Sequence, residues 1–183
     1  MVNLFKYADE MIRKLMLAAI VLISLTSCKS RKAIDFQKAL DQQERNASNV
    51  LVGKDGPAEE KLACLIKKDF KGALRAIDRE QQAFNKIIGD ISALPTAGIP
   101  QGDELKAASV SYYKAVRDLQ GLDREEVTQR EASYLTDTAR VRQAQDSLLQ
   151  LSREKLNRHA IVREQGEVLY AARQKFRAAN KLE

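Results

Sequence analysis

The spacing of the apolar residues after position 30 constrains the fold more than any other feature of the chain. Apolar side chains recur there every three or four positions, which is the spacing of one face of an α-helix. Residues that interrupt helices are scarce, since the 183 residues include 8 Gly and 3 Pro. No stretch alternates apolar and polar residues as a half-buried strand does. The sequence therefore predicts an all-α fold.

Glycine and proline divide this pattern into segments. A first helix is predicted over about residues 32–51, because residues 53–57 contain two glycines and a proline. A second amphipathic helix of about 35 residues is predicted from Pro57, because one apolar stripe continues along it. The members of this stripe are Leu62, Ile66, Phe70, Ala73, Ile77, Phe84, Ile87, Ile88 and Ile91. Residues 94–102, with two prolines and two glycines, are predicted to end the helix as a loop.

The rest of the chain is predicted to be helical, with two junctions left open. Asp103 is the predicted N-cap of the third helix. Residues 121–123 allow a kink or a break, since Asp123 and Glu126 have the spacing of a capping box. Residues 157–159 allow either a tight turn or a continuous helix. An apolar stripe beyond them predicts helix nearly to the C-terminus.

Each of these helices has an apolar stripe that it cannot bury by itself. The stripes must therefore pack against each other, and the sequence predicts an elongated antiparallel bundle of three to four long amphipathic helices. A chain of 183 residues can bury such a core as one domain without disulfides or metals. An oligomeric coiled coil is the alternative, especially over residues 123–182, but it ranks second because strict heptads are not sustained.

The segment before the first helix has the order of a secretory signal. A basic start at Met11, with Arg13 and Lys14, is followed by an almost entirely apolar run over residues 15–25. This run is shorter than the roughly 20 residues that a membrane-spanning helix needs. Because acidic residues at positions 9 and 10 are unusual in a signal, Met11 is a candidate for the true start.

The last residues of this segment, Leu25-Thr26-Ser27-Cys28, resemble the lipobox of bacterial lipoproteins. The resemblance implies transfer of a diacylglyceryl group to the Cys28 thiol, cleavage between Ser27 and Cys28, and acylation of the new amino group, for instance with palmitate. Two or more acyl chains suffice for stable anchoring. The implied layout is a signal peptide over 1–27, a lipidated tether over 28–31 and a helical bundle domain over 32–183.

The resemblance also implies a location. In many such lipoproteins an aspartate after the acylated cysteine retains the protein in the inner membrane, and this chain has Lys29 there. The expected location is therefore the bacterial cell envelope, on the periplasmic side, with the outer membrane favoured over the inner one. Nucleic acid is not expected as a partner of an exported protein.

Few residues carry the chemistry of enzymes or metal sites. The chain has one histidine, His159, which is expected to be exposed, and one thiol besides Cys28. No zinc pattern, di-iron motif, phosphate-binding loop or nucleophile elbow is present. We therefore predict no catalytic residue, no cofactor, no metal and no enzymatic activity. The second thiol, Cys64, is interpreted as a partly buried inert group or as an intermolecular disulfide across a dimer.

Four cations are predicted to share one face of the second helix, opposite its apolar face. This basic stripe consists of Lys68, Lys71, Arg75 and Arg79. It is a candidate contact for an anionic polymer or lipid, and its simpler interpretation is a solvated helix face. The cations Arg173, Lys175, Arg177 and Lys181 are interpreted as partners of the C-terminal helix dipole.

These observations predict a class of function. The anchor, the long amphipathic stripes and the missing catalytic groups favour a non-enzymatic structural or interaction module of the envelope, which contacts an envelope protein or itself. The alternative is a helical module that binds an anionic polymer, a lipid or a small apolar ligand.

Overall fold

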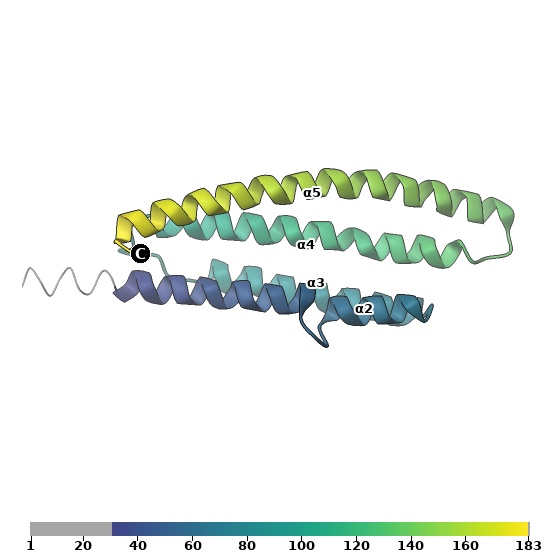
Figure 1. Cartoon of the computed structure of the whole chain (residues 1–183), viewed down its shortest axis with the longest axis horizontal. Coiled ribbons are helices and arrows are strands. Elements are labelled where there is room, and N and C mark those ends of the chain that lie inside the picture. Colours follow the sequence, from purple (N-terminus) through teal and green to yellow (C-terminus); the bar gives the residue numbers. More distant parts are fainter. Residues whose placement is uncertain (1–30, 183) are drawn as a thin grey trace, which may run out of the picture.

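The computed structural model describes residues 31–182, which are helices joined by short connections without any strand (Figure 1). The all-α prediction is therefore confirmed. The first helix covers residues 31–52, and the helices after it are α2 (Pro57–Ile66), α3 (Phe70–Ser92), α4 (Gly102–Ala132) and α5 (Thr138–Asn180). The predicted signal peptide and the lipobox with Ser27 and Cys28 lie outside the described residues.

The helices lie along one axis and form an elongated rod (Figure 1). The first helix and α2 follow each other along one side, α3 runs back beside them, and α4 and α5 form a long hairpin. The 43 residues of α5 span about 65 Å at 1.5 Å per residue.

The two ends of the rod differ in what they contain. The proximal end contains residue 31, residue 182 and the α3–α4 loop, whose Pro100 carbonyl accepts a hydrogen bond from Asn180 at 2.8 Å. The distal end contains the α2–α3 turn at residues 67–69 and the α4–α5 loop at residues 133–137.

The prediction of one continuous helix over α2 and α3 is wrong. The chain turns at residues 67–69, where Lys68 has a left-handed φ of 58°. The Asp69 amide donates to the Cys64 carbonyl at 2.9 Å, and the Asp69 side chain accepts from the Gly72 amide at 2.8 Å. These bonds end one helix and cap the next, so that α3 folds back against α2.

Because of this turn, part of the predicted apolar stripe is not in the core. Leu62 and Ile66 match the stripe of α3 in spacing, but in the folded chain they lie exposed on the outside of α2. Periodicity alone does not show a turn when the residues on both sides keep the same spacing.

The helix break in the C-terminal half lies at neither of the two predicted junctions. Helix α4 continues through residues 121–123, and α5 continues through residues 157–159. The chain turns instead at residues 133–137, and Asp137 caps α5 by accepting from the amides of Ala139 and Arg140. A kink or break at the two considered junctions is therefore not found.

The predicted N-cap of α4 is also wrong. Helix α4 begins at Gly102, and its N-cap is Gln101, which has a left-handed φ of 58°. Asp103 lies in the first turn, where its carboxylate accepts a hydrogen bond from the Thr96 hydroxyl. An acidic residue there still favours the helix through the positive end of its dipole.

Most of the buried core lies in the proximal half of the rod. The rings of Phe36 and Phe176 are 5.6 Å apart and join the first helix to α5. The largest fully buried side chains of the main core are those of Phe84, Phe176, Ile91 and Leu105. A second, smaller cluster of Ala73, Ile77 and Val127 joins α3 to α4 nearer the distal end.

Candidate functional site

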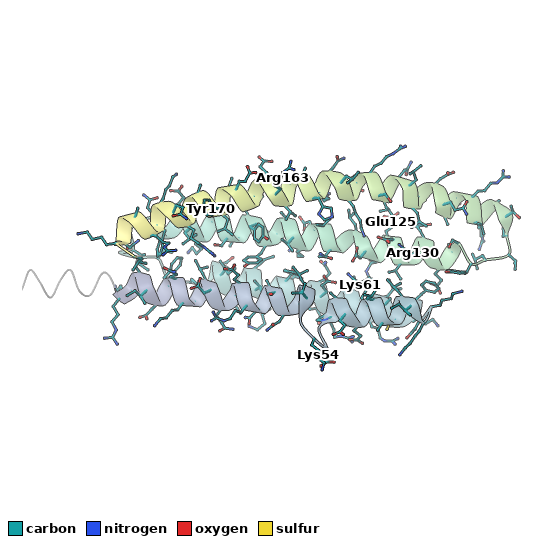
Figure 2. All side chains as sticks on the ribbon, in the orientation of Figure 1. Lys54, Lys61, Glu125, Arg130, Arg163 and Tyr170 are labelled. Atoms are coloured by element: carbon teal, nitrogen blue, oxygen red, sulfur yellow. The ribbon has the colours of Figure 1, made fainter. Side chains whose placement is uncertain are left out.

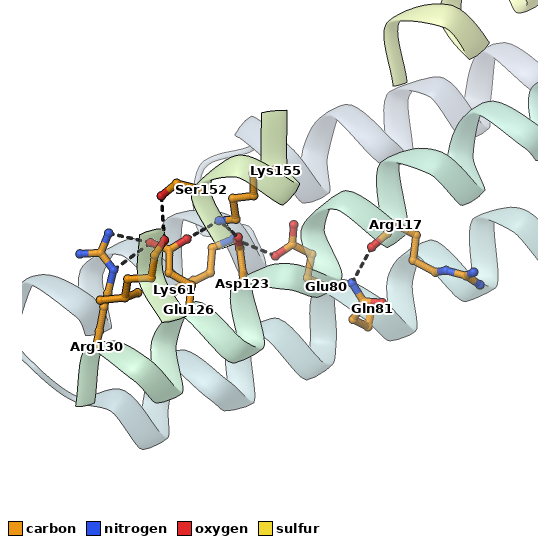
Figure 3. Close-up of polar contacts among 10 residues, drawn as sticks. Lys61, Glu80, Gln81, Arg117, Asp123, Glu126, Arg130, Ser152 and Lys155 are labelled. Atoms are coloured by element: carbon orange, nitrogen blue, oxygen red, sulfur yellow. Dashed lines mark hydrogen bonds and ion pairs between the residues drawn. The ribbon is translucent and has the colours of Figure 1, made fainter. Parts of the chain in front are cut away.

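A cluster of opposite charges lies where α2, α3, α4 and α5 meet (Figure 3). We call it the charge cluster; it consists of Lys61 on α2, Glu80 on α3, Asp123 and Glu126 on α4, and Lys155 on α5. The Lys61 ammonium is 3.2 Å from Glu80 Oε2 and also bonds to Asp123. The Lys155 ammonium is 2.5 Å from Asp123 Oδ1 and also bonds to Glu126. Each lysine thus bridges two carboxylates on one or two helices.

Burial dominates the electrostatics of Glu80. Its side chain is 0% exposed, and its Oε1 atom has no hydrogen-bond partner among the described residues. Burial raises the pKa of Glu80, and the nearby charge of Lys61 opposes this only in part. A carboxyl group without solvent exposure cannot contact a substrate. We therefore expect Glu80 to have a structural role.

The other two carboxylates of the cluster behave in the opposite way. Burial disfavours the charge of Asp123, but hydrogen bonds from Lys155 and Lys61 outweigh it and lower its pKa. Burial likewise opposes the charge of Glu126, and hydrogen bonds from Lys155 and Arg130 lower its pKa. Both groups are therefore held as carboxylates, which fixes the two lysines between the helices.

A second feature is an apolar groove of about 400 Å³ between the first helix, α4 and α5. Its floor includes Tyr112 and Tyr113 of α4, whose rings are 5.1 Å apart and edge to face. Gly166 of α5 lies beside the Tyr112 ring, and a Cβ atom there would make an ordinary contact with the ring at 3.6 Å. An ion pair of 2.9 Å between Glu44 and Arg173 joins the two walls.

The tyrosines of the groove differ in their surroundings. Tyr113 is buried, and this burial together with the nearby Glu44 carboxylate raises the pKa of its phenol. The phenol therefore stays protonated and is available as a hydrogen-bonding group on an otherwise apolar floor. Tyr170 lies exposed on the groove wall formed by α5 (Figure 2). Tyr113 thus packs in the core, whereas Tyr170 does not.

The predicted basic stripe is divided by the α2–α3 turn. Lys68 lies in the turn, and its ammonium is 4.4 Å from the centre of the Tyr134 ring, as in a cation–π contact. Only Lys71, Arg75 and Arg79 belong to α3. The four residues therefore do not form one stripe of a single helix.

Two cations of this group also have carboxylate neighbours. Arg79 pairs with Glu60 of α2, and Arg75 lies 4.0 Å from Asp69. Within residues 31–182, no carboxylate pairs with Lys71. The unpaired charge therefore gathers at the distal end and is not spread along α3.

Two of the four C-terminal cations have specific partners, while Arg177 lies in the last turn of α5. Arg173 pairs with Glu44, and Lys175 pairs with Glu104 at 2.7 Å. These ion pairs tie α5 to the first helix and to α4, which is a different role from the predicted contact with the helix dipole.

The remaining candidates for chemistry are isolated. Cys64 is half-buried and faces α3, where its sulfur would lie 2.7 Å from a Cβ atom at position 72. His159 is exposed within α5, as predicted. Among residues 31–182, no group of three or more His, Cys, Asp or Glu side chains is placed to hold a metal ion.

The charge cluster and the groove were not predicted from the sequence. One signal for the cluster was present, because Glu80 occupies a stripe position of α3 between Ile77 and Phe84. A charged residue at such a position requires a buried partner. The groove has no sequence signal, since it depends on how far the first helix and α5 separate over α4.

Comparisons of the chain with known protein families, with curated proteins and with solved structures give no match. The helices described above define the class of the fold, which is an all-α helical rod. Within the described part of the chain, no helix has both the length and the apolar character needed to cross a membrane.

Proposed function

We propose that this chain is a bacterial envelope lipoprotein, anchored by an acylated Cys28, whose helical rod acts as a non-enzymatic structural or interaction module. The observation that carries the proposal is the position of residue 31 at the proximal end of a rod about 65 Å long. Cys28 precedes this residue by only three positions. Acylation there would hold the proximal end at the membrane and present the helices to partners.

The charged groups of the rod support a structural role. The carboxylates of the charge cluster bind lysines of other helices, and Glu80 is closed to solvent. Large apolar side chains outside the groove remain exposed, including Leu149, Leu156 and Val168. Such surfaces fit an envelope protein partner or a second copy of the chain better than they fit a substrate.

The anchor is tested by comparing the whole chain with its Cys28→Ser variant in a Gram-negative host. We expect labelled palmitate in the unaltered chain and none in the variant, which should also leave the membrane fraction. Cys64→Ser is the matched control and should keep its label. Equal labelling of the Cys28→Ser variant would refute the anchor.

A second variant tests whether the lipoprotein is located in the outer or the inner membrane. Lys29→Asp should move the labelled chain from the outer to the inner membrane on a density gradient, because the lipobox resemblance implies that this position is read. An unchanged distribution would remove the argument for the outer membrane and leave the anchor intact.

A second candidate function is the binding of an apolar ligand, and the groove is the observation that favours it. Its floor and walls are mainly apolar, and it is open along one side. A lipid acyl chain fits such an open groove better than a compact ligand does. The polar Tyr113 phenol and the Glu44–Arg173 pair would contact its head group.

This candidate is tested with a fatty acid whose fluorescence rises in an apolar site, such as cis-parinaric acid. Gly166→Leu would fill the groove and is expected to lower binding at least tenfold. Gly89→Leu is the control, because position 89 is exposed and a Cβ atom there meets no neighbour within 4 Å. Equal binding by both variants would exclude the groove as the site.

A further inference from the structure

Two connections that are far apart in the sequence meet at the distal end of the rod. The ring of Tyr134, in the α4–α5 loop, lies 5.8 Å from the ring of Phe70 at the start of α3. The Lys68 side chain of the α2–α3 turn covers the same tyrosine. The turn and the loop therefore form one surface, which we call the distal tip: residues 66–75 and 131–142.

The distal tip has an excess of positive charge. It contains six cations, Lys67, Lys68, Lys71, Arg75, Arg140 and Arg142, against the three carboxylates Asp69, Glu131 and Asp137. Two of these carboxylates, Asp69 and Asp137, are engaged as N-caps of α3 and α5. Lys67, Lys68 and Lys71 are exposed, and no carboxylate within residues 31–182 pairs with them.

Large apolar side chains are exposed between these cations. Ile66 is 74% exposed, Tyr134 is 61% exposed and Leu135 is 47% exposed. Ile66 ends α2 next to the α2–α3 turn, and Tyr134 and Leu135 lie in the α4–α5 loop. Isolated exposed apolar residues are ordinary. Three of them on one basic tip form a surface that can bind both anionic groups and apolar groups.

We propose that the distal tip is a docking surface for an anionic lipid bilayer. Lysines attract anionic head groups, while tyrosine and aliphatic side chains enter the boundary between head groups and acyl chains. A soluble anionic polymer would use the lysines but would leave Ile66 and Leu135 in water. The combination therefore favours a bilayer over a polymer.

The direction of docking rests on the proposed function. If Cys28 anchors the proximal end, the tip lies about 65 Å away and meets a second membrane surface and not the anchoring one. The rod would then hold two lipid surfaces together. The tip itself does not depend on the anchor, and the two are tested by separate readouts.

The experiment is a vesicle-capture assay with the whole, lipidated chain. Donor vesicles of phosphatidylcholine carry the chain, and acceptor vesicles contain phosphatidylcholine with or without phosphatidylglycerol. We expect clustering, measured by light scattering, only with phosphatidylglycerol, and we expect added salt to weaken it. Flotation of the donor vesicles reports the anchor independently.

Variants assign the capture to the tip. The triple variant Lys67→Glu, Lys68→Glu and Lys71→Glu should reduce clustering at least tenfold, and Ile66→Ser with Leu135→Ser should also reduce it. The matched control reverses three exposed cations along the rod and has the same net charge: Lys38→Glu, Lys114→Glu and Arg163→Glu. This control should cluster vesicles like the unaltered chain.

The possible results separate the hypotheses. Donor vesicles that float with the chain but capture no acceptors would overturn the docking proposal and keep the anchor. Clustering that is equally lost in the control variant would also overturn it, since net charge would then suffice. Lysine-dependent binding of soluble polyphosphate without capture of vesicles would assign the tip to a polymer and refute the bilayer.

Discussion

Glu80 is the residue whose environment is least expected in a stable core. Its carboxyl group is fully buried, and only one of its two oxygens has a hydrogen-bond partner. Replacing a buried ion pair by apolar residues often stabilises a protein, so Glu80 does not explain the stability of the rod. The charge cluster instead joins α2 to both α3 and α4, because Lys61 bonds to Glu80 and to Asp123.

The raised pKa of Glu80 predicts a pH dependence that Glu80→Gln removes. Because its folded pKa lies above its unfolded value near 4.5, the protonated group contributes stability that is lost as the pH rises through the folded pKa. Denaturant unfolding should find the variant equal to the unaltered chain at pH 4 and more stable, by about 1 kcal/mol, at pH 8. A variant that is less stable at pH 8 would contradict this.

The same comparison separates Glu80 from its neighbours. The lowered pKa values of Asp123 and Glu126 mean that they contribute stability above their ordinary pKa, which is lost as the pH falls. Both proteins share this acid-dependent loss. The difference between the two unfolding curves therefore reports Glu80 together with its coupling to Lys61 and Asp123.

Lys61→Met tests the pairing from the other side. The substitution leaves Glu80 buried beside no other hydrogen-bonded cation, and we expect a loss of about 3–5 kcal/mol in the free energy of unfolding at pH 8. The double variant with Glu80→Gln should regain most of this loss, since no buried charge then remains unpaired. Additive losses in the double variant would show that the two side chains are not coupled.

At the scale of the elements, α2 is the least firmly packed helix. It has no buried side chain and is bounded by the 53–56 connection and the turn at 67–69. Close approach to α3 holds it in place, and Gly72 makes that approach possible. A Cβ atom at this position would meet Cys64 Sγ at 2.7 Å and the carboxylate of Asp69 at a shorter distance.

Two glycine substitutions in α3 should therefore have opposite effects. Gly72→Ala is expected to lower the free energy of unfolding by about 1–3 kcal/mol, because Asp69 is fixed as an N-cap and cannot easily move. Gly89→Ala should raise it by about 0.5–1 kcal/mol, since that helical position is open. Thermal unfolding measures both. Equal shifts in one direction would refute the close contact.

The sequence predicts helices well and their junctions poorly. The C-terminal end of the first helix, expected at about residue 51, lies at residue 52, because glycines and a proline follow it. The turn at Asp69 was missed, since apolar spacing continues across it, and the loop before Asp137 was missed because Leu135 fits the same spacing. After each connection an aspartate caps the next helix: Asp69 caps α3 and Asp137 caps α5. The apolar spacing does not indicate either cap.

The candidate sites were less predictable than the elements. The charge cluster joins residues from four helices, so its geometry depends on the tertiary packing, and only Glu80 within an apolar stripe indicated it. The basic stripe was predicted on one continuous helix, but the structure has two helices there, α2 and α3. The groove and the distal tip depend on the separation and the unequal lengths of the helices, which spacing along the chain does not encode.

At the scale of the whole molecule, packing is uneven along the rod. In α5 the proximal part buries Ala172 and the large ring of Phe176 within the main core, while the distal part buries Ala144 and Leu151, which do not belong to that core. The α4–α5 hairpin also extends beyond the end of α2 and α3, so its last turns have fewer neighbours (Figure 1). Local opening is easiest where few apolar contacts are broken.

We therefore expect amide hydrogen exchange to differ along this one helix. Residues 138–150 should exchange at least tenfold faster than residues 160–176, because the former open locally and the latter require global unfolding. Phe176→Ala should cost about 3–5 kcal/mol and accelerate exchange everywhere in the rod. Leu149→Ala, at an exposed position, should change stability by less than about 0.5 kcal/mol and leave the pattern unchanged. Uniform protection along α5 would mean that the rod unfolds as one unit and that its distal end is as firmly packed as its proximal end.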